Sequence, residues 1–128
     1  ALDELKIDRI DHGNRSLEDD ALIARIRDAG ITLTVCPLSN LSLCVVDDLK
    51  DHPMKKMLAL GLKATVNSDD PAYFGGYVNQ NFKETAEAVG LTREEIITLA
   101  KNSFIGSFLS PEDQAPHLAE IDSIAAAH

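Results

Sequence analysis

Short apolar runs and longer amphipathic segments alternate through the first half of the chain. The runs have the length of buried strands, whereas apolar residues in the segments between them recur every three to four positions, as on one face of a helix. Gly30 and Gly61 follow these segments, where glycine commonly ends a helix. The pattern predicts strands over residues 7–10, 31–36 and 63–67, with helices from Ser16 to Ala29 and from Pro53 to Leu60.

The second half of the chain is predicted to be mostly helical. Thr92 to Glu95 has the sequence of a capping box, which predicts that a helix begins there. Helices are expected over residues 77–89 and 93–104 and from Ser110 onward, and a short one over residues 1–5. Residues 38–51 and 72–77 lack helical periodicity and are predicted to be loops, the first longer than most connections.

The ends of the three predicted strands recur at a regular interval. His12, Asn40 and Asp69 lie at or just beyond these ends, and just under 30 residues separate each from the next. This is the period of a β-loop-α unit, so we expect parallel strands joined by right-handed crossovers. A parallel sheet needs helices over its faces or closure into a barrel. We therefore predict an α/β fold, the C-terminal part of a TIM-type (β/α)8 barrel with about three βα units and trailing helices.

The chain opens without Met, in a segment that resembles the interior of a longer protein. We expect residues 1–128 to be the C-terminal portion of a single barrel domain whose N-terminal portion is absent. Both outer strands of such a fragment would have open edges. The expected partner of these edges is the missing N-terminal portion of the barrel or, alternatively, a second copy of the chain.

Composition narrows the class of partner. The formal net charge is −9, which argues against nucleic acid and anionic membranes and favours a neutral or cationic small molecule. No apolar run approaches the ~20 residues of a membrane span, and the N-terminus does not resemble a signal peptide. We expect a soluble, cytoplasmic protein. Cys36 and Cys44 lack the spacing of a zinc knuckle and are expected to be free thiols.

Adjacent carboxylates follow the third predicted strand. Asp69 and Asp70 lie just beyond it, and Pro71 prevents the strand from continuing. Two carboxylates so close together favour a nearby cation, although a capped turn would explain the same residues. His12 would share their end of a parallel sheet, and imidazole with carboxylate suits zinc or proton transfer around a metal-bound water.

The remaining histidines are weaker candidates for metal ligands. His52 and His117 lie at or near predicted helix starts, and His128 is terminal. We expect each of them to be solvated or to cap a helix. The residues of this chain alone therefore predict only half of a metal site.

Four segments in order resemble the motifs of the adenosine and adenine deaminase family, at the family's spacing and over nearly the whole chain. They are Arg9-Ile10-Asp11-His12-Gly13, Leu17-Glu18-Asp19, Cys36-Pro37-Leu38-Ser39-Asn40 and Asn67-Ser68-Asp69-Asp70-Pro71. Within the family, residues 41–46 and 68–77 are similar to the branch that acts on the free base. The resemblance implies hydrolytic deamination of adenine to hypoxanthine and ammonia, a purine-salvage reaction, by a zinc-activated water.

The resemblance also implies roles for individual residues. Asp69 would be a zinc ligand. His12 would be the catalytic residue beside the attacking water, and it would orient this water or move its proton. Asp70 would bind the purine at N7 and fix the ring. Ser39 and Asn40 would line the opening of the same site, but no role is assigned to them. Tyr73 and Phe74 would either wall the base pocket or only pack within their loop.

Several parts of the family's site have no counterpart in this chain. The His-x-His strand, a third histidine ligand and a glutamate proton donor would all precede Ala1. The chain would thus supply one of four expected protein ligands to Zn2+, and we expect it alone neither to hold zinc tightly nor to deaminate adenine. Two alternatives remain: a parent that acts on adenosine, and a non-catalytic interaction module that uses its open sheet edge.

Overall fold

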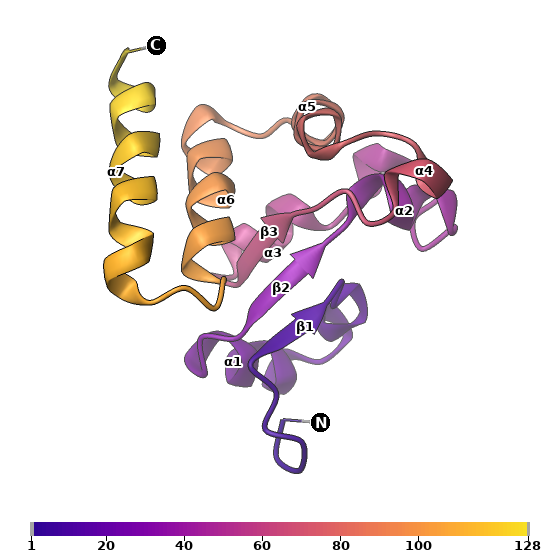
Figure 1. Ribbon diagram of the computed structural model, residues 1–128. Helices are drawn as coiled ribbons and strands as arrows, with labels where there is room; N and C mark the ends of the chain where they lie inside the picture. Colours follow the sequence, from indigo (N-terminus) through magenta and orange to yellow (C-terminus); the bar gives the residue numbers. More distant parts are fainter. Residues whose placement is uncertain (1, 128) are drawn as a thin grey trace.

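A computed structural model describes residues 2–127 (Figure 1). Its sheet contains β1 (Arg9–Asp11), β2 (Thr32–Val35) and β3 (Lys63–Val66), in that order and all parallel. The predicted strands and their parallel arrangement are confirmed, with boundaries shifted by one or two residues. In Figure 1 the three strands point toward the side where the short helices α2 and α4 lie, so this side holds the carboxyl ends of the strands.

Helices of very different length connect and follow the strands. Two 3-10 helices, η1 and η2, accompany them. The elements are η1 (Asn14–Glu18), α1 (Asp20–Asp28), α2 (Pro37–Ser42), η2 (Leu49–Asp51), α3 (Met54–Ala59), α4 (Pro71–Phe74), α5 (Val78–Val89), α6 (Arg93–Ile105) and α7 (Pro111–Ala127). The capping box predicted for α6 is present, because Thr92 Oγ1 accepts from the Glu95 backbone N–H while the Glu95 carboxylate accepts from that of Thr92.

The two faces of the sheet differ in polarity. Successive side chains of a strand point to opposite faces, and the register places Ile10, Leu33 and Ala64 in one row across the sheet. The neighbouring row contains Asp11, Thr34 and Thr65. The apolar face is packed against helices, whereas no helix among residues 2–127 covers the face turned to the viewer in Figure 1. The polar face is therefore available to form part of a site.

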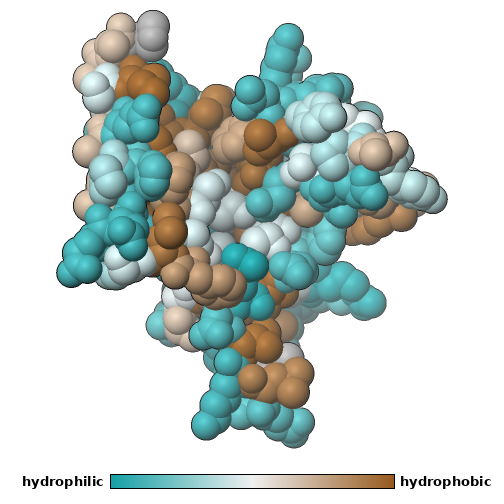
Figure 2. Space-filling view, viewed as in Figure 1, coloured by the Kyte–Doolittle hydropathy of each residue, from teal (hydrophilic) through white to brown (hydrophobic). Residues whose placement is uncertain are grey.

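The hydrophobic core lies between the apolar face and the helices. α6 packs along β3, where the Asn102 amide donates to the Ala64 carbonyl at 2.8 Å, and α7 packs on α6 with hydrophobic side chains along their seam (Figure 2). The buried members of the core come from the regions of β2 and β3 and from α1, α3 and α6, and Ile10 of β1 packs against them: Ile23, Ile26, Ile31, Leu33, Val35, Met54, Met57, Leu62, Ala64, Val66 and Leu99. None of the helices within residues 2–127 is long and apolar enough to cross a membrane.

Four local predictions were wrong. Residues 2–5 form turns rather than a helix, since so short an exposed segment cannot offset the cost of helix nucleation. Asp19, not Ser16, caps α1: its carboxylate accepts from the backbone N–H groups of Ala21 and Leu22, while Ser16 is buried in η1. The predicted loop over residues 38–51 contains α2 and η2, and the one predicted over residues 72–77 contains most of α4. Pro37 at the first turn of α2 explains that helix, because proline is favoured there.

Candidate active site

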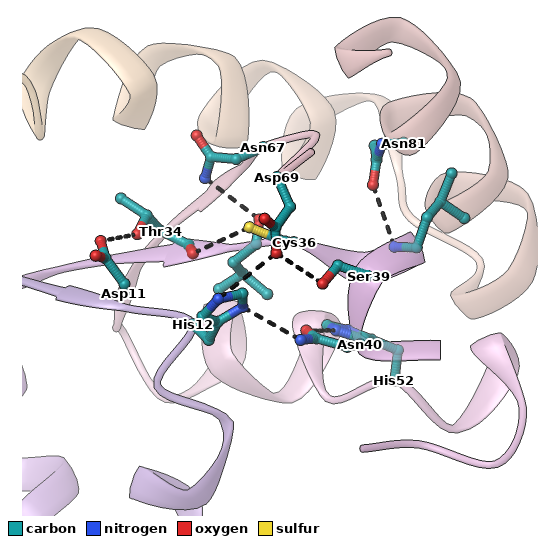
Figure 3. A network of polar contacts seen from close by, with 12 residues as sticks. Asp11, His12, Thr34, Cys36, Ser39, Asn40, His52, Asn67, Asp69 and Asn81 are labelled. Atoms are coloured by element: carbon teal, nitrogen blue, oxygen red, sulfur yellow. Dashed lines mark hydrogen bonds and ion pairs between the residues drawn. The ribbon is translucent and has the colours of Figure 1, made fainter. Parts of the chain in front are cut away.

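An open cleft lies at the carboxyl ends of the strands, on the polar face of the sheet. Its volume is about 570 Å³. The cleft is lined by side chains from the strands and from the segments that follow them: Arg9, Asp11, His12, Thr34, Cys36, Asn67, Ser68, Asp69 and Val78. Figure 3 shows His12, Cys36 and Asp69 close together, with Asp11 and Thr34 paired beside them. The position agrees with the rule that ligands of parallel α/β folds bind where the strands end.

His12 and Asp69 meet in this cleft. His12 Nε2 lies 3.7 Å from Asp69 Oδ2, with the two side chains 40% and 28% exposed (Figure 3). Both residues have left-handed backbones, with φ of 61° and 58°, which side chains other than glycine adopt at a cost of about 1–3 kcal/mol. Gly13 continues the turn after His12 with φ of 77°, and a Cβ there would approach Leu33 Cδ2 to 2.8 Å. The chain therefore turns sharply at both strand ends and directs the two side chains toward each other.

Helix α2 contributes two buried polar side chains to the same place. Ser39 Oγ donates to Asp69 Oδ2 at 2.7 Å, and Asn40 Nδ2 lies 3.3 Å from His12 Nδ1. Ser39 is fully buried and Asn40 is 2% exposed. A second contact holds the helix in place, because Asn81 of α5 accepts from the Leu38 backbone N–H at 3.1 Å. Helix α2 thus fixes the orientation of both His12 and Asp69.

His52 lies behind Asn40 and is buried. Its Nε2 is 3.1 Å from Asn40 Oδ1, and its Nδ1 accepts from the Met54 backbone N–H at 3.2 Å. Burial lowers the pKa of His52 from 6.5 to about 4, so the ring is neutral at pH 7. Of the two predicted roles, solvated or capping, His52 takes the second: its side chain is 3% exposed, and it accepts from the backbone N–H of Met54, the first residue of α3.

Cys36 completes a group of potential metal-binding atoms. One ligand atom each from His12, Cys36 and Asp69 lies within 4.8 Å of the others, a donor set of nitrogen, sulfur and oxygen that suits zinc. Burial, followed by the charges of Asp69 and Asp11, raises the pKa of the Cys36 thiol to about 11, and the thiol donates to the Thr34 carbonyl at 3.6 Å. As predicted, Cys36 and Cys44 are free thiols.

Asp70 has a different environment from Asp69. Its carboxylate caps α4, accepting from the backbone N–H groups of Ala72 and Tyr73 at 3.0 and 3.2 Å. Both bonds use Oδ1, which leaves the lone pairs of Oδ2 for another donor. Asp70 is exposed and is not among the side chains that line the cleft. The structure of residues 2–127 therefore brings His12 and Asp69 together, but it leaves Asp70 at the rim beside them.

The aromatic residues after Asp70 also lie outside the cleft. Tyr73 is 79% exposed, and its ring meets that of Phe74 edge to face at a centroid distance of 4.9 Å. Sequence reasoning placed Asn40 at the site without a role, and it missed the contact between His52 and Asn40 because His52 does not follow a strand. One available signal was the concentration of polar residues after Pro37, at the start of a helix that faces a strand end.

The parallel sheet has a polar face, helices lie behind it, and an imidazole meets a carboxylate at its strand ends. This is the arrangement of a (β/α)8-barrel enzyme, whose catalytic side chains lie at the ends of the strands. The model of the adenosine deaminase family matches residues 1–124. The chain belongs to this family. The prediction that it forms the C-terminal part of a (β/α)8 barrel is thereby confirmed.

Curated relatives include adenine deaminases from Sphingopyxis alaskensis, 66% identical over 125 residues and 98% of this chain, and from Caulobacter vibrioides, 66% identical over the whole chain. The chain spans 37% of the length of each relative.

Solved structures of relatives superimpose closely on the described fold. The adenine deaminase of Arthrobacter aurescens matches with a TM-score of 0.95 and 48% identity over 98% of this chain and 38% of that one. An amidohydrolase from Burkholderia ambifaria, crystallised with bound Zn, matches with a TM-score of 0.82 and 28% identity over 100% of this chain and 38% of that one.

Proposed function

We propose that the full-length protein containing this chain hydrolyses the C6 amine of adenine, giving hypoxanthine and ammonia in purine salvage. The observation that carries the hydrolase chemistry is the pairing of His12 with Asp69 at 3.7 Å in a cleft at the strand ends. The 66% identity to proteins named adenine deaminase supports adenine as the substrate.

Asp69 is proposed as a ligand of Zn2+. Asp69 offers a carboxylate oxygen, a donor that zinc binds, and the amidohydrolase with bound Zn supports this choice of metal. When bound, zinc acidifies water and so supplies a nucleophile at neutral pH. Ser39 holds Asp69 Oδ2 by a hydrogen bond of 2.7 Å, which keeps the carboxylate oriented and accepting. His12 would lie beside the attacking water as the catalytic residue of this chain.

Asp70 is proposed to bind the imidazole edge of the purine at N7. Its Oδ1 is held by the α4 cap, so the carboxyl group is rigid while Oδ2 can reach a ligand. The hydrogen bond to N7 needs one proton, carried by either Asp70 or the ring. Such a contact would orient the purine so that C6 faces His12 and Asp69.

Steady-state kinetics of the purified, zinc-loaded full-length protein with adenine and adenosine test the proposal. We expect a higher kcat/KM for adenine. A higher kcat/KM for adenosine would instead support a nucleoside substrate. Absence of turnover with both purines would contradict the proposed function and leave the interaction module as the better interpretation.

We further propose that these 128 residues alone neither retain zinc stoichiometrically nor deaminate adenine. Within residues 2–127, the only group of three or more potential ligands is His12, Cys36 and Asp69. Zinc sites in proteins have three or four protein ligands, and Asp69 is the single carboxylate in this group. The edges of β1 and β3 would be paired by the rest of the barrel or by a second copy of the chain.

A further inference from the structure

A chain of hydrogen bonds runs from the backbone of α3 to the proposed catalytic histidine (Figure 3). We propose that Asn40 and His52 are positioning residues that hold His12 in its Nε2–H tautomer, with that N–H directed at Asp69 and the cleft. The tautomer follows from the hydrogen bonds alone, and only its catalytic consequence rests on the proposed function.

The direction of every bond is set by the backbone N–H of Met54. A backbone amide can only donate, so His52 Nδ1, 3.2 Å away, must accept. An imidazole with a lone pair on Nδ1 carries its proton on Nε2. His52 therefore donates from Nε2 to the Asn40 side chain at 3.1 Å. The depressed pKa of His52 agrees with a neutral ring.

The Asn40 amide transmits this direction to His12. Its oxygen must face His52 in order to accept, so its NH₂ group faces His12 Nδ1 at 3.3 Å. A reversed amide would place its NH₂ group against Nε2–H of His52, so that two donors would face each other. Because Asn40 is 2% exposed and His52 is 3% exposed, water cannot readily compensate for this mismatch.

The tautomer narrows the role of His12 in the reaction. With Nδ1 accepting from Asn40, the neutral ring has its proton on Nε2, the atom 3.7 Å from Asp69 Oδ2. This nitrogen then has no lone pair with which to take a proton from water. His12 is thereby assigned as a hydrogen-bond donor that orients the attacking water toward C6, and the proton of that water must leave through another group.

The decisive test reads the tautomer by NMR in the zinc-loaded full-length protein labelled with ¹⁵N-histidine. Long-range ¹H–¹⁵N spectra distinguish a protonated ring nitrogen from one with a lone pair. We expect Nε2 of His12 and of His52 to be protonated and both Nδ1 atoms to have lone pairs. A neutral His12 with its proton on Nδ1 would overturn the proposal, and this measurement needs no variant.

Asn40→Asp tests whether the hydrogen bonds from His52 through Asn40 determine the tautomer of His12. The aspartate can still accept from His52, but it presents an acceptor to His12 Nδ1 in place of a donor. We expect Nδ1 of His12 to become protonated and kcat to fall about 10- to 100-fold, with a smaller change in KM and zinc content retained. Asn79→Asp adds the same charge at an exposed site of α5 and should leave the spectrum and kcat unchanged.

The remaining outcomes separate the two proposals. An unchanged kcat or unchanged His12 spectrum in Asn40→Asp would overturn the positioning role. A protein with the expected His12 tautomer that turns over neither adenine nor adenosine would contradict the proposed function while leaving the hydrogen-bond relay intact.

Discussion

The burial of His52 predicts that the protein loses stability in mild acid. The ring is neutral in the folded state because burial lowers its pKa to about 4, whereas the unfolded chain has the ordinary value of 6.5. Between these values the unfolded state binds a proton that the folded state does not. The contribution of a neutral His52 to stability is therefore fully present above pH 6.5 and is lost as the pH falls toward 4.

The pKa difference sets the size of the effect. Each pKa unit corresponds to about 1.4 kcal/mol, so the free energy of unfolding should fall by about 3 kcal/mol once the pH is below 4. At pH 5 the loss should already be about 2 kcal/mol. His52 is 3% exposed, so solvent screening does not reduce these values greatly.

Urea denaturation of the full-length protein and of His52→Gln at pH 7.5 and pH 5 isolates this contribution. The difference in unfolding free energy between the two proteins should change by about 2 kcal/mol between these pH values, since only the wild type carries the titrating ring. His117→Gln is the matched control, because His117 is exposed and stacks on Phe104, and it should keep the wild-type pH dependence. A difference between wild type and His52→Gln that does not vary with pH would refute the reasoning.

Three further predictions concern the site and the core. Asp69→Ala in the full-length protein should lose zinc, whereas Asp70→Ala should keep zinc and lose affinity or turnover for adenine. Metal analysis and kinetics check both variants, and loss of zinc in Asp70→Ala with retention in Asp69→Ala would reverse the two assignments. Ser39→Ala removes the 2.7 Å hydrogen bond to Asp69 and should weaken zinc binding by about 10-fold in a chelator competition, so unchanged affinity would contradict its orienting role. Leu99→Ala opens a cavity beneath β3 and should cost about 2–5 kcal/mol in urea denaturation with little change in KM; a loss below 1 kcal/mol would contradict its central place in the core.

Local sequence signals were sufficient where neighbouring residues determine the conformation. The Thr92–Glu95 capping box lies within one helical turn, and α6 begins where it predicts. Glycine stops and the regular spacing of strand ends likewise predicted the βα units, because strand and helix periodicities are readable from adjacent residues.

The adjacent aspartates that follow β3 were only partly interpretable from sequence. A cation site and a capped turn both explained them, and the structure shows the capped turn for Asp70 alone, with Asp69 directed into the cleft. Asp69 has a left-handed backbone with φ of 58°, whereas Asp70 has φ of −99°, so the two adjacent side chains point in different directions. The sequence contains no local signal that distinguishes the two aspartates in this way.

By itself, the sequence determined the α/β class, the parallel order of strands and the end of the sheet at which chemistry gathers. Only the tertiary structure decided how His12 is held, because Asn40 of α2 contacts its ring and His52 in turn contacts Asn40, and both are distant from His12 in the chain. The physical reason is that hydrogen bonds between such residues depend on how α2 and α3 pack against the sheet. That packing also buries His52 and so sets its charge, its bond direction and the proton position on His12.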